Sequence, residues 1–289
     1  MSIGSDWRRR CGAAERPIRM AHRATDDTGR EFVSAGVPRR VVSLVPSVTE
    51  LVCALGCAAQ LVARTRYCTH PEAVVSRLVA VGGTKDPDCD AIIALRPDVV
   101  LVNSEENRIE DVQRLKAADV RVFVTFPNTV AAAAQSAVRL GHLLGADVAA
   151  DRLAAEIDAA RLEVAAGVGR RSSVFCPVWR NPWMSFNGDT YAHDLLRCAG
   201  GDSVCEALTE RYPEVDLAEV ARSQPEVILL PDEPYRFAKQ HLSSLTALAD
   251  TPAWRARRIH FVDGKALWWY GPRTPSALRY FQGLLRSPR

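Results

Sequence analysis

The feature that most constrains this chain is a long segment without proline, residues 129–169. It is rich in alanine, and Leu153 and Ile157 recur in it at near-helical spacing. A helix over residues 151–166 alone would extend about 24 Å at 1.5 Å per residue. Because a helix of that length is stiff, the segment is predicted to be a connecting backbone helix that separates two parts of the protein.

Short apolar runs alternate with helical patterns on both sides of this segment. The predicted strands include residues 41–45, 99–102 and 120–125 before it, and residues 173–178, 227–230 and 259–262 after it. Strands interleaved with helices favour α/β units with mainly parallel sheets. We therefore predict an α/β protein of two lobes, residues 38–128 and 170–289, joined by the helix over 129–169.

A weak internal repeat relates the two lobes. Residues 88–106, DCDAIIALRPDVVLVNSEE, resemble residues 214–233, EVDLAEVARSQPEVILLPDE. Each segment has an acid, a short amphipathic helix, a proline, a β-branched strand and further acids. Two similar lobes would enclose a cleft, which is the usual place for a ligand. A duplication without any ligand would leave the same repeat.

Composition excludes several classes of function. The net charge of +3 and the lack of a Lys/Arg tract argue against a nucleic-acid partner. No apolar stretch reaches the roughly 18 residues that a membrane span needs. Residues 1–37 are Arg-rich without apolar periodicity, so we expect a loosely ordered tail there and no secretory signal. On these grounds a monomer in the cytoplasm is expected, and its eight cysteines are expected to be reduced and mostly buried.

Enzymatic motifs are missing from the sequence. The segment AAGVGRRSS, residues 165–173, is close to a dinucleotide-binding loop, but it follows a helix and precedes a strand, the reverse of the required order. There is no HExxH or GxSxG, and the six histidines are scattered without an i, i+4 pair. No catalytic residue, metal site or resident cofactor is therefore predicted.

Aromatic residues cluster in predicted loops instead. The clusters are VWRNPWMSFNGDTY (178–191) and ALWWYGPR (266–273), with Tyr67 as a matching aromatic in the first lobe. Rings at a cleft suit a broad, flat ligand, although rings in loops also fill ordinary crevices between helix and sheet. Arg180, Asn181 and Arg273 would meet polar groups on the ligand rim, or the arginines would pair with local carboxylates. On an extended stretch neighbouring residues alternate faces, so Trp268 is expected to pack inward and Trp269, alone or with Tyr270, to face the cleft.

Four segments together resemble a known family, the helical-backbone (class III) substrate-binding proteins. They are VVSLVPSVTELVCALG, RYCTHPEA…VGGTKDPDCDAIIALRPDVVLVNSEEN, VWRNPWMSFNGDTYAHDLLRCAGG and WWYGPR, and the resemblance covers about residues 38–286. The cobalamin-binding members of iron/cobalamin ABC importers are the most similar branch. This resemblance implies a non-enzymatic protein that binds a cobalamin-like corrinoid or a related metal chelate between two lobes.

The resemblance also implies roles for single residues. The ligand-binding positions would be Pro46, Ser47, Tyr67, Trp179, Trp183, Trp269, Tyr270 and Arg273. Exposed acids that dock to arginines of an ABC permease would be Glu72 on the first lobe and Glu210 on the second, where Glu206 and Glu214 compete with it. A setting outside the cytoplasmic membrane, periplasmic or at the cell surface, is usual in the family.

Other functions remain open on the sequence alone. An iron-siderophore or haem would be alternative ligands for the same fold. An enzyme acting on tetrapyrroles, such as a chelatase, also uses two α/β lobes, and it would be favoured if His70 and His193 converged. A lone histidine such as His70 is more often a hydrogen-bonded structural residue than a metal ligand. A sensor or scaffold that lost its ligand is a further alternative.

Overall fold

The first lobe is built on a five-stranded parallel sheet. The computed structural model describes residues 22–286, and in the first lobe the strand order is β5-β4-β3-β6-β7. The strands are β3 (Val41–Ser43), β4 (Leu61–Arg64), β5 (Val79–Ala80), β6 (Val99–Asn103) and β7 (Val122–Thr125). The helices are α1 (Pro46–Ala54), η1 (Ala58–Gln60), α2 (Glu72–Val75), α3 (Cys89–Ala94) and α4 (Ile109–Ala117). The predicted parallel α/β architecture is confirmed for this lobe.

The second lobe repeats the arrangement on a four-stranded parallel sheet with the order β11-β10-β8-β9. The strands are β8 (Ser172–Phe175), β9 (Gly201–Ser203), β10 (Val227–Pro231) and β11 (Ile259–Val262). The helices are α7 (Tyr191–Cys198), α8 (Leu217–Arg222), η2 (Lys239–Leu248), α9 (Pro252–Arg255), α10 (Gly264–Trp268) and α11 (Thr274–Leu285). Both sheets are parallel and carry helices, as the sequence predicts.

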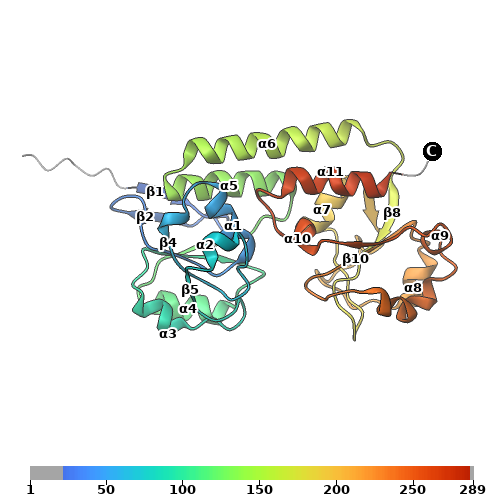
Figure 1. Ribbon diagram of the computed structural model, residues 1–289, viewed down its shortest axis with the longest axis horizontal. Coiled ribbons are helices and arrows are strands. Elements are labelled where there is room, and N and C mark those ends of the chain that lie inside the picture. The colour runs from blue at the N-terminus through green and yellow to red at the C-terminus, as the bar shows by residue number, and fades with distance from the viewer. Residues whose placement is uncertain (1–21, 287–289) are drawn as a thin grey trace, which may run out of the picture.

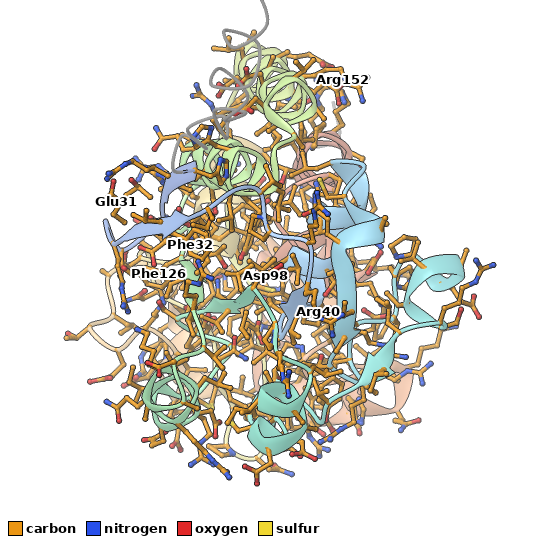
Figure 2. All side chains as sticks on the ribbon, turned by 90° about the vertical axis from the view of Figure 1, so that its left-hand side faces the viewer. Glu31, Phe32, Arg40, Asp98, Phe126 and Arg152 are labelled. Carbon is orange, nitrogen blue, oxygen red and sulfur yellow. The ribbon has the colours of Figure 1, made fainter. Side chains whose placement is uncertain are left out.

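The internal repeat corresponds to β6 and β10, which lie inside their sheets. At the start of β6, the Asp98 carboxylate accepts hydrogen bonds from the backbone amides of Arg39 and Arg40 at 2.7 and 2.9 Å. At the start of β10, the Glu226 carboxylate accepts one from the amide of Ser173 at 3.1 Å. An acid one residue after the proline therefore tethers the neighbouring strand in both lobes. Asp98 and Arg40 lie on the face of the first lobe that Figure 2 shows.

The segment between the lobes is a pair of helices, and the prediction of one helix over 129–169 is wrong in this respect. Helix α5 (Val130–Leu144) ends at Gly145, whose φ of +71° is left-handed, and α6 (Asp147–Ala166) then runs back along it. Gly141 permits their close contact, because a Cβ there would lie 2.2 Å from the Cβ of Ala150. The 20 residues of α6 extend about 30 Å, and Figure 1 shows α6 crossing above both lobes, with α5 and α11 beneath it.

Part of the predicted tail is folded, so the expectation of a loosely ordered tail is wrong for residues 22–37. Strands β1 (His22–Thr25) and β2 (Glu31–Ser34) form an antiparallel hairpin that packs on α5. Phe32 is buried in the core, and Figure 2 shows it beside Glu31 on the hairpin. The Asp27 carboxylate accepts from the amide of Phe126 at 2.8 Å and from Arg139 at 2.9 Å. The remainder of the tail, residues 1–21, lies outside the described residues.

One hydrophobic core is continuous across both lobes. Its buried members come from the first sheet, from α5 and α6, and from the second sheet and α11; they include Leu51, Leu101, Leu140, Ile157, Val174, Leu229 and Phe281. Because the side chains of both lobes pack on the same two helices, the lobes are held in a fixed relation. Between residues 22 and 286, no helix is both long enough and apolar enough to cross a membrane.

Candidate functional site

Two predicted aromatic residues are exposed on loops at the carboxyl ends of strands, one in each lobe. Tyr67 follows β4 and has 52% of its surface exposed, and Trp179 follows β8 with 43% exposed. The guanidinium of Arg66 lies 5.0 Å above the Tyr67 ring and is paired with Asp86 at 2.7 Å. Trp179 contacts Tyr235 edge-on at 5.5 Å. Strand ends of parallel sheets are where α/β folds hold ligands, so these rings are candidates for ligand contact.

Trp183 has a different environment from Trp179. Its ring stacks on Phe237 at 5.9 Å with an interplanar angle of 6°, and it packs against the core of the second lobe. The turn that carries both tryptophans is closed by hydrogen bonds between Val178 and Met184 at 2.8 Å and between Met184 and Trp179 at 3.2 Å. Trp183 therefore anchors the turn, and Trp179 is the ring that the turn presents to solvent.

Helix α10 covers the first part of the segment ALWWYGPR and ends at Trp268, and the backbone of Trp269, which follows, is extended. Trp268 packs into the second lobe, edge-on to Phe186 at 5.4 Å, and its indole nitrogen donates to the carbonyl of Glu233 at 2.9 Å. Trp269 turns the other way and is only 8% exposed. It contacts His70 of the first lobe edge-on at 5.8 Å. The side of Trp269 that was predicted to face the cleft is therefore packed against the first lobe.

Tyr270 reaches across to the first lobe and is buried there. Its phenol lies 2.8 Å from the hydroxyl of Thr125, at the end of β7. The phenol also accepts a hydrogen bond from the side-chain amide of Asn103, at the end of β6, at 3.2 Å. Ser47, at the start of α1 beside Pro46, is also buried against this phenol. Burial strongly raises the pKa of Tyr270, so the phenol stays protonated. Tyr270 therefore joins the two sheets.

Arg273 pairs with a carboxylate of the first lobe. Its Nε and Nη2 donate to the two oxygens of Glu50, on α1, at 2.7 and 2.8 Å. The guanidinium also lies 5.2 Å from the ring of Trp269. Such a bidentate pair has a fixed geometry. Two roles were predicted for Arg273, contact with polar groups of the ligand and pairing with a carboxylate, and the structure shows the second.

A second ionic contact joins the lobes near the strand ends. The Glu105 carboxylate, just after β6, accepts from Arg211 Nε and, at 2.9 Å, from the Tyr212 hydroxyl. Arg211 also pairs with Asp189 at 2.7 Å, and Asp189 accepts from Asn128 at 2.9 Å. Sequence reasoning did not single out Glu50, Glu105 or Arg211, because nothing local in the sequence shows that their partners lie in the other lobe.

Two further carboxylates lie near this contact. Glu106 follows β6 and is exposed beside Glu105. Glu233 follows β10, and burial raises its pKa although Lys265, at 3.6 Å, opposes the shift. The neutral form of Glu233 is therefore favoured relative to that of an exposed glutamate.

The acids proposed for permease docking are on the surface. Glu72 begins α2, Glu210 lies in the loop before α8, and both are exposed. Within the described chain, no ion pair involves either of them. Glu206 lies 3.8 Å from Nε2 of the buried His193. No described contact joins His193 to His70, so the arrangement that would favour a tetrapyrrole-acting enzyme is not found.

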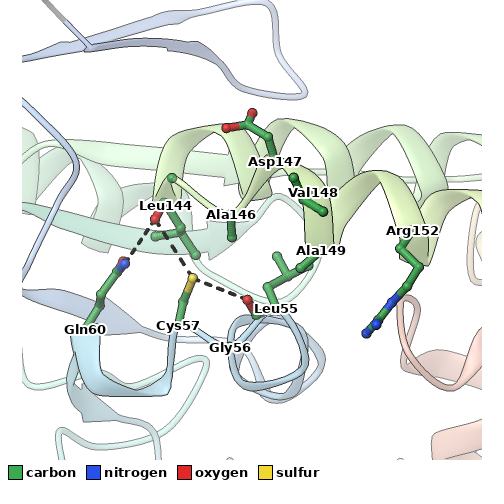
Figure 3. A pocket seen from close by; sticks show the side chains of 11 residues that line it. Leu55, Gly56, Cys57, Gln60, Leu144, Ala146, Asp147, Val148, Ala149 and Arg152 are labelled. Carbon is green, nitrogen blue, oxygen red and sulfur yellow. Dashed lines mark hydrogen bonds between the residues drawn. The ribbon is translucent and has the colours of Figure 1, made fainter.

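Two recesses in the surface lie away from these loops. One of about 600 Å³ is bounded by the end of α1, by η1 and by the α5–α6 turn, with Cys57, Gln60 and Arg152 among its lining residues (Figure 3). Another of about 230 Å³ lies beside the β1–β2 hairpin. Among residues 22–286, no group of three or more His, Cys, Asp or Glu side chains is placed to hold a metal. The seven described cysteines are free thiols, five of them buried.

Comparisons with known proteins agree with this architecture. A family model described as periplasmic binding protein matches residues 41–266. A vitamin B12-binding protein of Photorhabdus laumondii is 26% identical over 195 residues, which cover 67% of this chain and 70% of that protein. The periplasmic heme-binding protein RhuT of Roseiflexus sp. RS-1 superposes with a TM-score of 0.76 at 25% identity, covering 87% of this chain and all of that one.

A further solved structure shows the same fold at lower identity. The periplasmic vitamin B12 binding protein BtuF of Vibrio cholerae has a TM-score of 0.75 at 18% identity, covering 86% of this chain and 96% of that one. The relatives are binding proteins, so the expectation of a binding protein and not an enzyme is confirmed. Their setting is periplasmic, and the expectation of a cytoplasmic location finds no support. The family model spans well over half of the chain, which therefore belongs to the periplasmic binding protein family.

Proposed function

We propose that this protein binds a cobalamin-like corrinoid between its two lobes and delivers it to an ABC permease. The observation that carries this proposal is the pair of exposed rings, Tyr67 and Trp179, on strand-end loops of opposite lobes. A flat ligand that covers an exposed tryptophan or tyrosine ring stabilises the complex. Stacking contributes about 0.5–1.5 kcal/mol in addition to the contribution from the buried area. The vitamin B12-binding relatives at 26% identity support the choice of ligand.

The other predicted ligand positions take a second role in this proposal. Pro46, Ser47, Tyr270 and Arg273 fix the lobes relative to each other, and Trp183 anchors the turn that presents Trp179. The ligand would then meet a site whose walls are already placed, so less ordering is required when it binds. Trp269 lies between His70 and Arg273 and would contribute only its remaining exposed edge.

Haem is the second candidate ligand. The Nδ1 of His70 lies 2.9 Å from the Thr69 hydroxyl, and its Nε2 has no partner among the described residues. An imidazole held in this way is suited to ligate iron. Two heme-binding proteins at 25% identity share the fold, RhuT and BhuT, with TM-scores of 0.76 and 0.75.

Docking to a permease would use one exposed acid on each lobe. Glu72 and Glu210 lie at the surface of different lobes, where each would pair with an arginine of the partner. This role implies a periplasmic location for the protein, which would act as a monomer. Replacing both acids by glutamine should abolish transport in a reconstituted importer while leaving ligand affinity unchanged.

The binding proposal is tested by titrating the purified protein with cyanocobalamin and with hemin, following the visible spectrum and the heat of binding. Trp179→Ala and Tyr67→Ala should each weaken binding by roughly threefold to thirtyfold. Tyr280→Ala is the matched control, since Tyr280 is 40% exposed on helix α11 and does not lie on a loop that follows a strand. Binding of neither ligand, or equal losses in all three variants, would overturn the proposal.

A further inference from the structure

Arg180 differs from Arg273 and Arg211, two other arginines of the second lobe. Arg273 donates to Glu50, and Arg211 donates to Glu105 and Asp189, so each of these two guanidiniums is neutralised. Within the described chain, no ion pair or hydrogen bond involves the guanidinium of Arg180. Its Nε is nevertheless shielded from solvent and has no acceptor. A shielded donor without a partner is unfavourable, so an acceptor is expected to reach it in the functional state.

The position of Arg180 is fixed by the turn that contains it. Arg180 follows Trp179 directly, and the backbone of Trp179 pairs with that of Met184 across the turn. Asn181 has a φ of +63°, a left-handed conformation that asparagine tolerates better than most residues. Trp183 anchors the end of the turn on Phe237. The turn therefore fixes the backbone of Arg180 directly after that of Trp179.

We propose that Arg180 recognises an anionic group on the rim of the ligand. The proposal rests on the binding function above, and it names the part of the ligand that this side chain reads. Arginine suits this task because its planar, permanently charged group can donate two parallel hydrogen bonds to phosphate or carboxylate. In a corrinoid with a nucleotide loop the anion would be the phosphodiester, and in haem it would be a propionate. A ring stacked on Trp179 would bring its rim to the neighbouring arginine.

One anionic group on the ligand suits the position of Arg180. A ligand with such a group next to the Trp179 ring would gain the contact with Arg180, whereas a ligand without one would leave the shielded Nε unpaired. The site should therefore prefer one anionic substituent over none, and its position on the rim should matter.

Paired ligands, of which one carries the anionic group and the other lacks it, test the proposal. The first pair is cyanocobalamin and dicyanocobinamide, which lacks the nucleotide loop and its phosphate. The second pair is hemin and its dimethyl ester, in which both carboxylates are masked. Dissociation constants are measured for the wild-type protein, Arg180→Gln and Arg180→Lys. Arg222→Gln is the control, since Arg222 is an exposed arginine on α8 that pairs only with Glu219 of its own helix.

Arg180→Gln should weaken the anionic member of a pair by roughly tenfold to a hundredfold and leave the other member unchanged. Arg180→Lys should fall between, because it keeps the charge but loses the Nε donor. A loss confined to the corrinoid pair identifies the phosphodiester as the group recognised, and one confined to the haem pair identifies the carboxylate. Equal losses for both members, or no loss, would overturn the role of Arg180 while wild-type binding still stood. Failure of the wild-type protein to bind any of the four ligands would instead overturn the proposed function, and this inference with it.

Discussion

Replacing Tyr270 by phenylalanine tests the junction between the lobes most directly, because it removes one oxygen atom and leaves the ring. The phenol is buried, and it meets the Thr125 hydroxyl at 2.8 Å and the Asn103 amide nitrogen at 3.2 Å. Both partners belong to the first lobe, whereas Tyr270 belongs to the second. The free energy of unfolding therefore depends on these hydrogen bonds only if the lobes are assembled as described.

The expected loss follows from what each partner keeps. The Thr125 hydroxyl still donates to the carbonyl of Val102 at 2.9 Å, so losing its bond to the phenol costs about 1 kcal/mol. The Asn103 amide nitrogen is buried and has no other described acceptor, and leaving it unpaired costs about 1–3 kcal/mol. Tyr270→Phe should therefore lower the free energy of unfolding by about 2–4 kcal/mol.

Tyr191→Phe is the matched control within a single lobe. Its phenol contacts only the Thr274 hydroxyl, at 2.8 Å, and Thr274 still accepts from the amide of Gly271 at 3.0 Å. A loss of about 1 kcal/mol is expected. Urea unfolding followed by tryptophan fluorescence and by circular dichroism gives both values. If Tyr270→Phe proved no more destabilising than Tyr191→Phe, the junction would not be a stabilising contact and the reasoning would be refuted.

Three further changes can be measured by the same unfolding experiment. Glu50→Gln should lower the free energy of unfolding by about 1–3 kcal/mol, because Arg273 loses its charged partner; an unchanged value would show that the pair does not stabilise the junction. Glu233→Gln should become more stable relative to wild type as pH rises above 4.5, since the raised pKa of Glu233 means that the stabilisation by its protonated carboxyl is present below the unfolded pKa and is lost as pH rises through the folded pKa; a constant difference between pH 4 and pH 8 would contradict this. Gly141→Ala should lower the free energy of unfolding by about 1–3 kcal/mol, because the added methyl group forces α5 away from α6. Gly283→Ala, which has open space around it, should raise the free energy of unfolding by about 0.5–1 kcal/mol. Changes of the same sign in both variants would contradict the packing described.

The strands were predictable because burial on both faces leaves a strong local signal. All five residues of β6 and all five of β10 are buried, and both strands read as unbroken apolar or β-branched runs after a proline. The helices between them begin at polar side chains that accept from the backbone, such as Asp88 before α3 and Asp216 before α8. The parallel α/β class follows from this alternation without any knowledge of distant contacts.

The break in the connecting segment was visible in the sequence but ambiguous. Glycine inside an alanine-rich helix is tolerated at a cost of about 1 kcal/mol relative to alanine, so Gly141 and Gly145 alone do not require the helix to end. What requires it is the reversal of direction that brings Ala150 against Gly141. That contact depends on how α5 and α6 pack on both lobes, which no periodicity within the segment encodes. The folded hairpin before residue 38 was missed for a similar reason, because its apolar side chains are few and its anchors, Phe126 and Arg139, lie about 100 residues away.

The fate of ALWWYGPR shows where local reasoning about a binding site stops. The sequence predicts that Trp268 packs inward and that Trp269, alone or with Tyr270, faces the cleft. Trp268 does pack into the second lobe, whereas Trp269 and Tyr270 are buried against another surface. That other surface is protein, since Tyr270 bonds to Thr125 across 145 positions of the chain and Arg273 to Glu50 across 223. The Tyr270 phenol is buried between Thr125 and Asn103, and Glu50 neutralises the charge of Arg273, so both side chains serve the junction between the lobes. Of the rings and arginines that the sequence singled out for the ligand, those that remain exposed or unpaired among the described residues are Tyr67, Trp179 and Arg180. Because two of these three are consecutive residues of one short turn, ligand specificity should respond to changes in that turn, and the stability of the assembled lobes should respond to changes in ALWWYGPR.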